Sequence, residues 1–209
     1  MPRQVSDFTL EQFRHAAADP RPTPAGVAVA AVSAAFALGL LEKVLTVSGR
    51  RKELSANVAR LETHAAAAQA ASQRMLQLAG DDTAAFEAYL AARRLPHSTE
   101  SERQVQEQVI SSTVRRAIDL PLAAAQEAGA GLQLCTDASG LTPAALKADL
   151  AVTAALLAGA LRGFLLCAQS NVEQLAPQVA SLGEQVATET KRHQQALRQA
   201  EALLQPLKP

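Results

Sequence analysis

Two long segments of this chain consist mainly of alanine and other apolar residues and carry few charges. Residues 25–41 contain no charged side chain, and the only charged residues in the segment 148–170 are Asp149 and Arg162. Alanine is the strongest intrinsic helix former, so both segments are expected to be helical. The first is shorter than the about twenty strongly apolar residues that a membrane span needs, and Ala, Gly and Ser supply much of it. We therefore expect central helices covered by their neighbours and no membrane partner.

The rest of the composition favours helices packed closely against one another. Hydrophobic residues make up 48% of the chain, but aromatic residues only 3%. A sheet core would need more β-branched and aromatic side chains, and no strand-like alternation is present. The sequence predicts an all-α fold, an up-and-down helical bundle around two long alanine-rich central helices. No linker-like segment divides it, so residues 1–209 are expected to form a single domain.

Charge and cysteine content exclude several classes of function. Twenty basic and twenty acidic residues give a net charge of zero, without the basic surplus that nucleic-acid binding needs. Cys135 and Cys167 have no metal or redox spacing, and Cys167 is expected to be a small buried hydrophobe. The histidines are expected to be exposed and without a role, and no metal site is predicted. The polar start does not resemble a signal peptide, which favours the cytoplasm.

Turn and capping residues predict where the helices begin and end. Thr99 and Glu102 form a predicted capping box, Gly80 and Asp81 are expected to interrupt a helix, and Pro121 is expected to kink or break one. Thr142 is expected to cap the helix in which Pro143 is the first residue. The expected helices cover residues 6–18, 26–48, 53–79, a shorter stretch after Asp81, 99 to Pro121, 143–170 and 177–204.

Six short elements then occur in an order that is typical of one family. They are Pro22-Thr23-Pro24-Ala25-Gly26 before the first apolar helix, Gly49-Arg50-Arg51-Lys52 after it, Asp82-Thr83-Ala84-Ala85-Phe86, Leu95-Pro96-His97-Ser98-Thr99-Glu100, Pro121-Leu122, and Ala148-Asp149. This ordered set, which covers residues 20 to 170, resembles the cyclodeaminase/cyclohydrolase family of folate enzymes.

The resemblance implies one-carbon chemistry on tetrahydrofolate. Some members of the family release ammonia from 5-formiminotetrahydrofolate as the methenyl ring closes, and others hydrolyse 5,10-methenyltetrahydrofolate to the 10-formyl compound. The resemblance further implies a reduced folate as ligand, a homodimer, and no metal or organic cofactor.

The matching positions supply the candidate site residues. Asp82, Asp149 and Lys52 are the catalytic candidates, since the carboxylates can transfer protons and Lys52 can hold a folate carboxylate or a developing charge. The substrate-binding candidates are Thr23, Pro24, Gly26, Gly49 and Arg50. The first three stand at a helix start, where unpaired amides suit an anion.

Each of these candidates also has a structural interpretation. Pro24 and Gly26 can simply shape a turn, Asp82 can cap a helix after Gly80, and Arg50 and Lys52 can be solvated charges near a helix end. A buried Asp149 would be costly without a partner, which favours a carboxylate facing a ligand.

The chain departs from the family at several signature positions. The family's glycine triplet and following serine are replaced by Ala25-Gly26-Val27-Ala28, and its asparagine-rich segment near residue 164 reads Arg162-Gly163-Phe164-Leu165-Leu166. Val27 is expected to project a branched side chain toward an approaching ligand. Two functions therefore remain open: a folate enzyme with a remodelled pocket, and an inactive relative that serves as a helical binding or scaffolding protein.

Overall fold

The computed structural model describes residues 5–176 and 179–204, and within these ranges the chain forms helices and no strands. Its α-helices are α1 (Leu10–Ala18), α2 (Gly26–Gly49), α3 (Val58–Ala92), α4 (Glu100–Ala138), α5 (Lys147–Leu175) and α6 (Ala180–Leu204). Short 3-10 turns cover Val5–Asp7, Lys52–Asn57, Ser139–Leu141 and Ala144–Leu146. The predicted all-α class is confirmed.

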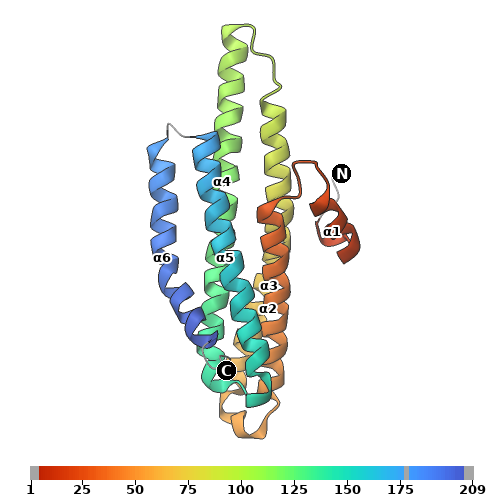
Figure 1. Ribbon diagram of the computed structural model, residues 1–209, viewed down its shortest axis with the longest axis vertical. Helices are drawn as coiled ribbons and strands as arrows, with labels where there is room; N and C mark the ends of the chain where they lie inside the picture. The colour runs from red at the N-terminus through yellow and green to blue at the C-terminus, as the bar shows by residue number, and fades with distance from the viewer. Residues whose placement is uncertain (1–4, 177–178, 205–209) are drawn as a thin grey trace.

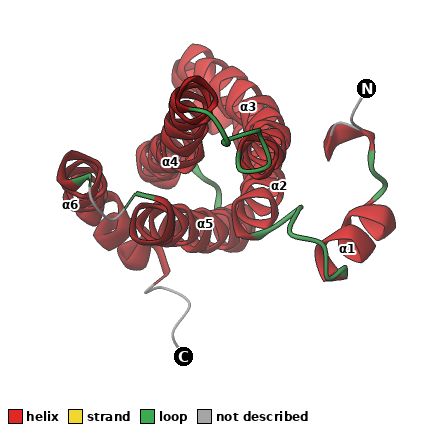
Figure 2. Ribbon diagram, turned by 90° about the horizontal axis from the view of Figure 1, so that it is seen from above, coloured by secondary structure: helices red, strands yellow, loops and turns green. Residues whose placement is uncertain are grey.

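Four of these helices form an up-and-down ring around the core. In the view from above, α2, α3, α4 and α5 surround the axis in that order, while α6 covers α4 and α5 from outside (Figure 2). α3 and α4 extend past the other helices and meet at a distant loop (Figure 1). The predicted central helices are α2 and α5, which pack against each other and close the ring.

The core is a lattice of alanines with leucines between them. Leu38, Leu41 and Leu45 of α2 and Leu157 and Leu161 of α5 are fully buried. Small residues let the helices approach this closely. A Cβ atom on Gly131 of α4 would lie 2.9 Å from a Leu38 methyl and 3.0 Å from a Leu157 methyl.

The predicted break near Gly80 is wrong, because α3 continues through that glycine to Ala92. A helix interior tolerates one glycine at a cost of about 1 kcal/mol, and packing of α3 against α2 and α4 outweighs that cost here. As a result Asp82 lies in the middle of a helix and caps none.

Pro121, which was expected to kink or break a helix, does not break it, since α4 continues from Glu100 to Ala138. A proline has no amide hydrogen, so the carbonyl four residues earlier, that of Ala117, loses its helical donor. Asn171 of α5 supplies the missing donor, with its Nδ2 2.8 Å from the Ala117 oxygen. Tertiary contact therefore repairs the helix where the local sequence would end it.

The remaining boundaries show which capping signals were reliable. The capping box of Thr99 and Glu102 is confirmed. Thr142 does not cap the next helix, because its hydroxyl donates backward to the Ala138 carbonyl at 2.8 Å, and α5 begins only at Lys147. The first predicted helix is divided, with Thr9 capping α1. The predicted start of the last helix at Pro177 lies outside the described residues.

Candidate functional site

The loop before α2 and the first turn of α2 hold three of the predicted binding residues together. Ala25 is the N-cap residue and makes no side-chain capping bond, so the first amides of α2 lack a capping partner and give this end a partial positive charge. The Thr23 hydroxyl donates to Glu87 Oε1 of α3 at 3.3 Å. This bond fixes the Thr23–Pro24–Gly26 segment beside α3.

Asp82 projects from the same part of α3 and is half-buried. Burial raises the pKa of its carboxyl from 3.8 to about 6. No hydrogen bond or ion pair holds this carboxylate within the described part of the chain. Such a group exchanges protons readily near neutral pH, which suits a general acid or base.

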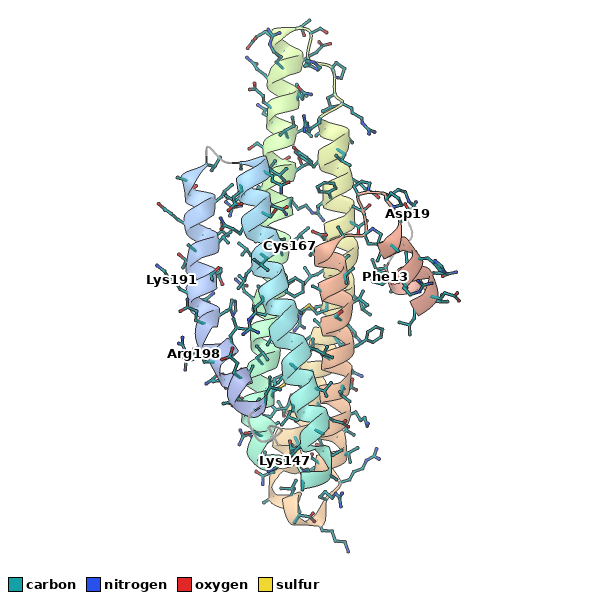
Figure 3. All side chains as sticks on the ribbon, in the orientation of Figure 1. Phe13, Asp19, Lys147, Cys167, Lys191 and Arg198 are labelled. Carbon is teal, nitrogen blue, oxygen red and sulfur yellow. The ribbon has the colours of Figure 1, made fainter. Side chains whose placement is uncertain are left out.

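Cys167 of α5 lies beside the first turn of α2, near the middle of the molecule's long axis (Figure 3). A Cβ atom on Gly26 would come within 3.1 Å of its Sγ atom. Burial raises the pKa of the thiol, and the nearby Asp82 carboxylate raises it further. Cys167 is therefore half-buried beside a charged group, and the expectation of a plain buried hydrophobe is wrong. No sequence spacing links residues 26, 82 and 167, so only the packing of three helices could reveal the group.

We name this group the Asp82 end; it comprises Thr23, Pro24, Gly26, Asp82 and Cys167. Next to it, the start of the chain and α3 enclose a hollow of about 340 Å³. Aromatic rings and charged groups share its wall, which is lined by Val5, Phe8, Phe13, Ala16, Arg21, Thr23, Pro24, Gly80, Asp81, Thr83, Ala84 and Glu87. A few polar groups in an otherwise apolar hollow of this size are typical of small-molecule sites.

The other predicted residues lie where α2 ends. Gly49 is the last residue of α2, Arg50 follows it, and Lys52 begins the next turn. Arg50 and Lys52 are exposed, and neither forms an ion pair with any described residue. Asp149, near the start of α5, pairs with Lys43 of α2, with 3.3 Å between Lys43 Nζ and its Oδ2.

We name this second group the Lys52 end; it comprises Gly49, Arg50, Lys52 and Asp149. The Asp149 side chain is 37% exposed, so it is not a buried carboxylate that needs a ligand as its partner. Lys43 pairs with it at the surface. Sequence analysis missed Lys43, because it stands among apolar residues more than one hundred positions from Asp149.

One chain does not bring the two ends together. Gly26 and Gly49 are 23 residues apart along α2, which corresponds to about 35 Å at the helical rise. Asp149 and Cys167 are 18 residues apart on α5, or about 27 Å. The expectation of a single pocket bounded by all the signature residues is therefore wrong for one chain. Figure 3 shows the same separation between Cys167 and Lys147.

Some of the altered signature positions belong to the core, whereas Ala25, Arg162 and Leu166 are exposed. Val27 is 5% exposed, and Ala28 and Phe164 are fully buried. The expectation that Val27 projects toward a ligand is wrong, because α2 turns this side chain toward its neighbours. Val27, Ala28 and Phe164 fill the bundle interior at the start of α2.

The histidines have different environments. His97 is exposed, as expected, with its Nδ1 3.1 Å from the Leu95 carbonyl. His193 of α6 is buried instead, with its ring against Gly129 of α4, and burial lowers its pKa. The expectation that it is exposed is wrong. Within the described ranges no three His, Cys, Asp or Glu side chains gather in a way that could hold a metal ion.

Comparison with known proteins places the chain in a family. The family model described as formiminotransferase-cyclodeaminase matches residues 9–192. The chain belongs to this family. Its fold also matches the crystal structure of formiminotetrahydrofolate cyclodeaminase from Thermotoga maritima, with a TM-score of 0.83 and 19% identity over 97% of this chain and 98% of that one.

This chain is also similar to the methenyltetrahydrofolate cyclohydrolase of Methylorubrum extorquens. It is 29% identical over 115 residues, which are 55% of this chain and 55% of the relative. The alignment thus spans about half the length of the relative. The predicted membership of the cyclodeaminase/cyclohydrolase family is confirmed.

Proposed function

We propose that this protein is a folate one-carbon enzyme that acts on the one-carbon unit of a tetrahydrofolate, as a methenyltetrahydrofolate cyclohydrolase or a formiminotetrahydrofolate cyclodeaminase. The observation that carries the proposal is Asp82, a half-buried carboxylate without an ion pair whose pKa is about 6. A structural carboxylate would be paired or solvated. The names of the two relatives supply the substrate class.

In hydrolysis, Asp82 acts as the general base. It takes a proton from water as the water oxygen bonds to the methenyl carbon, and the bond from that carbon to N5 then breaks as N5 regains a proton. With a pKa of about 6 the carboxyl is mostly ionised at neutral pH and is still basic enough to accept the proton. In deamination the N10 nitrogen takes the place of water, and ammonia leaves.

The remaining site residues bind the substrate. Unpaired amides at the start of α2, with Thr23, Pro24 and Gly26 around them, favour an anionic or acceptor group of the folate. Gly49, Arg50 and Lys52 suit glutamate carboxylates of a folate, and Asp149 is the second candidate for proton transfer. Because they lie at the other end of α2, about 35 Å away, they do not reach a folate held by Asp82 of the same chain. None of these roles requires a metal or an organic cofactor. We further propose a single-domain homodimer located in the cytoplasm.

A decisive test is titration with 5,10-methenyltetrahydrofolate, followed by the loss of its absorbance. Asp82→Asn should lower turnover by about a hundredfold or more, as expected for loss of a general base. Asp119→Asn is the matched control, because Asp119 of α4 is a partly exposed carboxylate 2.8 Å from Arg115 and does not line the hollow. Equal turnover in both variants would contradict the role of Asp82.

The alternative is an inactive relative that serves as a helical binding or scaffolding protein. The observation in its favour is the sealed start of α2, where Val27, Ala28 and Phe164 are core residues. A wild-type protein that neither binds nor converts methenyl- or formiminotetrahydrofolate would establish this alternative and exclude the enzyme.

A further inference from the structure

Helix α6 carries two ionisable side chains in the middle of the apolar strip that attaches it to the bundle. The residues of this strip are spaced alternately four and three apart, and they are Leu182, Val186, Glu189, His193, Ala196, Ala200 and Leu203. Leu182, Val186 and Ala200 are at most 5% exposed. The side chains of Glu189 and His193 are only 14% and 8% exposed. Packing alone would favour apolar residues at both positions, since burying polar groups costs free energy.

The fold provides a socket for the His193 imidazole. Gly129 of α4 faces it, and a Cβ atom at position 129 would come within 2.6 Å of both Cε1 and Nδ1 of the imidazole. The close approach of α6 to α4 at this level therefore needs a glycine on one side and the imidazole on the other. We name this contact of Gly129 with His193 the Gly129 socket.

The buried nitrogen of the imidazole has no hydrogen bond. Nε2 of His193 lacks a hydrogen-bond partner within the described part of the chain. Glu189 Oε2 lies 3.5 Å from it, close enough for an ion pair but long for a hydrogen bond. The other oxygen, Glu189 Oε1, accepts from Arg192 at 3.1 Å. A buried polar atom without a partner is uncommon in a folded protein, and in a histidine it lies on a group that can change charge near neutral pH.

The charges that act on the imidazole come from its own helix. Burial opposes protonation most strongly, the Glu189 carboxylate favours it, and the Arg192 guanidinium opposes it, so that the pKa of His193 is lowered from 6.5. From the helices packed against α6, Asp119 of α4 and Arg162 of α5 also contact α6. Both do so eight residues along α6 from His193, or about 12 Å away.

We propose that the Gly129 socket and the Glu189–His193 pair form an acid-sensitive latch, which holds α6 on α4 and α5 while His193 is neutral and releases it when the imidazole takes up a proton. The stability that the neutral imidazole provides is complete above pH 6.5 and is lost as the pH falls through 6.5 and then through the lowered pKa of the folded state. The latch does not rest on the proposed function.

Release of α6 changes the surface and not the ring. α6 packs chiefly on α4 and α5 from outside (Figure 2), so the four helices α2 to α5 keep their contacts without it. Gly129 of α4 and Val172 of α5 both lie under α6, Val172 beneath Gly183. Mild acid therefore uncovers an apolar strip between α4 and α5, through a local opening of one helix.

Hydrogen–deuterium exchange of the full chain measures the latch directly. With each exchange rate divided by the intrinsic rate at the same pH, residues 180–204 should lose protection by about threefold or more from pH 7.5 to 5.5, while α2 keeps its protection. His193→Gln removes the titrating group and should abolish this dependence on pH, whatever its protection at pH 7.5. His97→Gln is the matched control, because His97 is exposed, and it should respond like the wild type.

Two outcomes of this measurement would overturn the latch. If α6 of the wild type is equally or better protected at pH 5.5, the Glu189–His193 pair holds the charged imidazole and acid does not release it. If His193→Gln loses as much protection as the wild type, other groups cause the effect.

The two neighbouring charges give a second test that keeps the histidine in place. Glu189→Gln removes the charge that favours protonation in the folded state, so α6 should lose more protection between pH 7.5 and 5.5 than in the wild type. Arg192→Gln removes the charge that opposes protonation, so the loss should be smaller. The ratio of protection at the two pH values is compared, which cancels any loosening that is already present at pH 7.5. Equal ratios in the two variants, or the reverse order, would contradict the role of His193.

Discussion

At the scale of single residues, Asp82 is a candidate general base whose burial lowers the stability of the folded state at neutral pH. Its pKa is raised from 3.8 to about 6 because burial disfavours the charged form. The folded state therefore holds this proton more tightly than the unfolded state. Stability from this group is complete below pH 3.8 and is lost as the pH rises through 6.

Asp82→Asn should therefore stabilise the protein at pH 8 while it removes activity. The gain in the free energy of unfolding should be about 1–3 kcal/mol at pH 8, should be much smaller at pH 4, and should fall toward zero below pH 3.8, where the wild-type carboxyl becomes protonated in both states. Urea unfolding of both proteins at pH 4, 6 and 8 measures it. A gain that does not depend on pH would mean that the Asp82 carboxylate is not desolvated.

Val27 shows why putting the family's glycine back at one position would not by itself restore a folate site. Val27→Gly removes a buried side chain and places a glycine in the first turns of α2, so it should destabilise the fold by about 2–4 kcal/mol. We expect no gain in folate affinity from this change. Thermal unfolding and folate titration check both statements, and Ala25→Gly, at an exposed N-cap, is the mild control. Tighter folate binding by Val27→Gly would show that the site reaches this position.

At the scale of helices, α4 depends on a side chain from α5. Asn171→Ala should leave the Ala117 carbonyl without its donor and cost about 1–3 kcal/mol. With Pro121→Ala in the same chain, residue 121 regains an amide hydrogen and Asn171→Ala should cost clearly less. A double-mutant cycle by urea unfolding measures the difference. Additive effects would show that Asn171 does not compensate for the proline.

Helix α6 is positioned by a close contact between His193 and Gly129. A Cβ atom on Gly129 would come within 2.6 Å of the His193 ring, so Gly129→Ala should loosen α6 and destabilise the protein by about 1–3 kcal/mol. Adding His193→Ala should recover part of this loss, because the obstructing ring is gone. Gly140→Ala is the control, since open space surrounds Gly140. Unfolding curves should detect the recovery, and its absence would mean that the ring moves aside.

The same elements show what the sequence could predict. The alanine-rich segments and the Thr99–Glu102 box identified α2, α5 and the start of α4, because these signals are local. The predicted helix breaks at Pro121 and Gly80 did not occur, because contacts with residues distant in sequence decide whether a proline or a glycine ends a helix. The candidate residues were found by their order in the chain. Their separation into two groups depends on how the helices align in the fold, which no short sequence motif predicts.

At the scale of the whole molecule, two helices have the length and hydropathy of membrane spans. They are α2 and the segment Ala144–Leu175, and in each about 56% of the most apolar window is buried inside the bundle. The same apolar composition continues onto the outer sides of these helices, where Val29, Phe36 and Leu166 are exposed. Burial in the ring thus accounts for one side of each helix.

The closure of the ring by α2 and α5 has a consequence for how the protein assembles. The contacts of α2 with α3, α3 with α4, and α4 with α5 join consecutive helices, so they can form as the chain emerges from the ribosome. The seam between α2 and α5 must wait until residue 175 has been synthesised. The ring, and the leucine core that it encloses, are therefore complete only when that seam closes, and α2 remains uncovered on that side until α5 arrives.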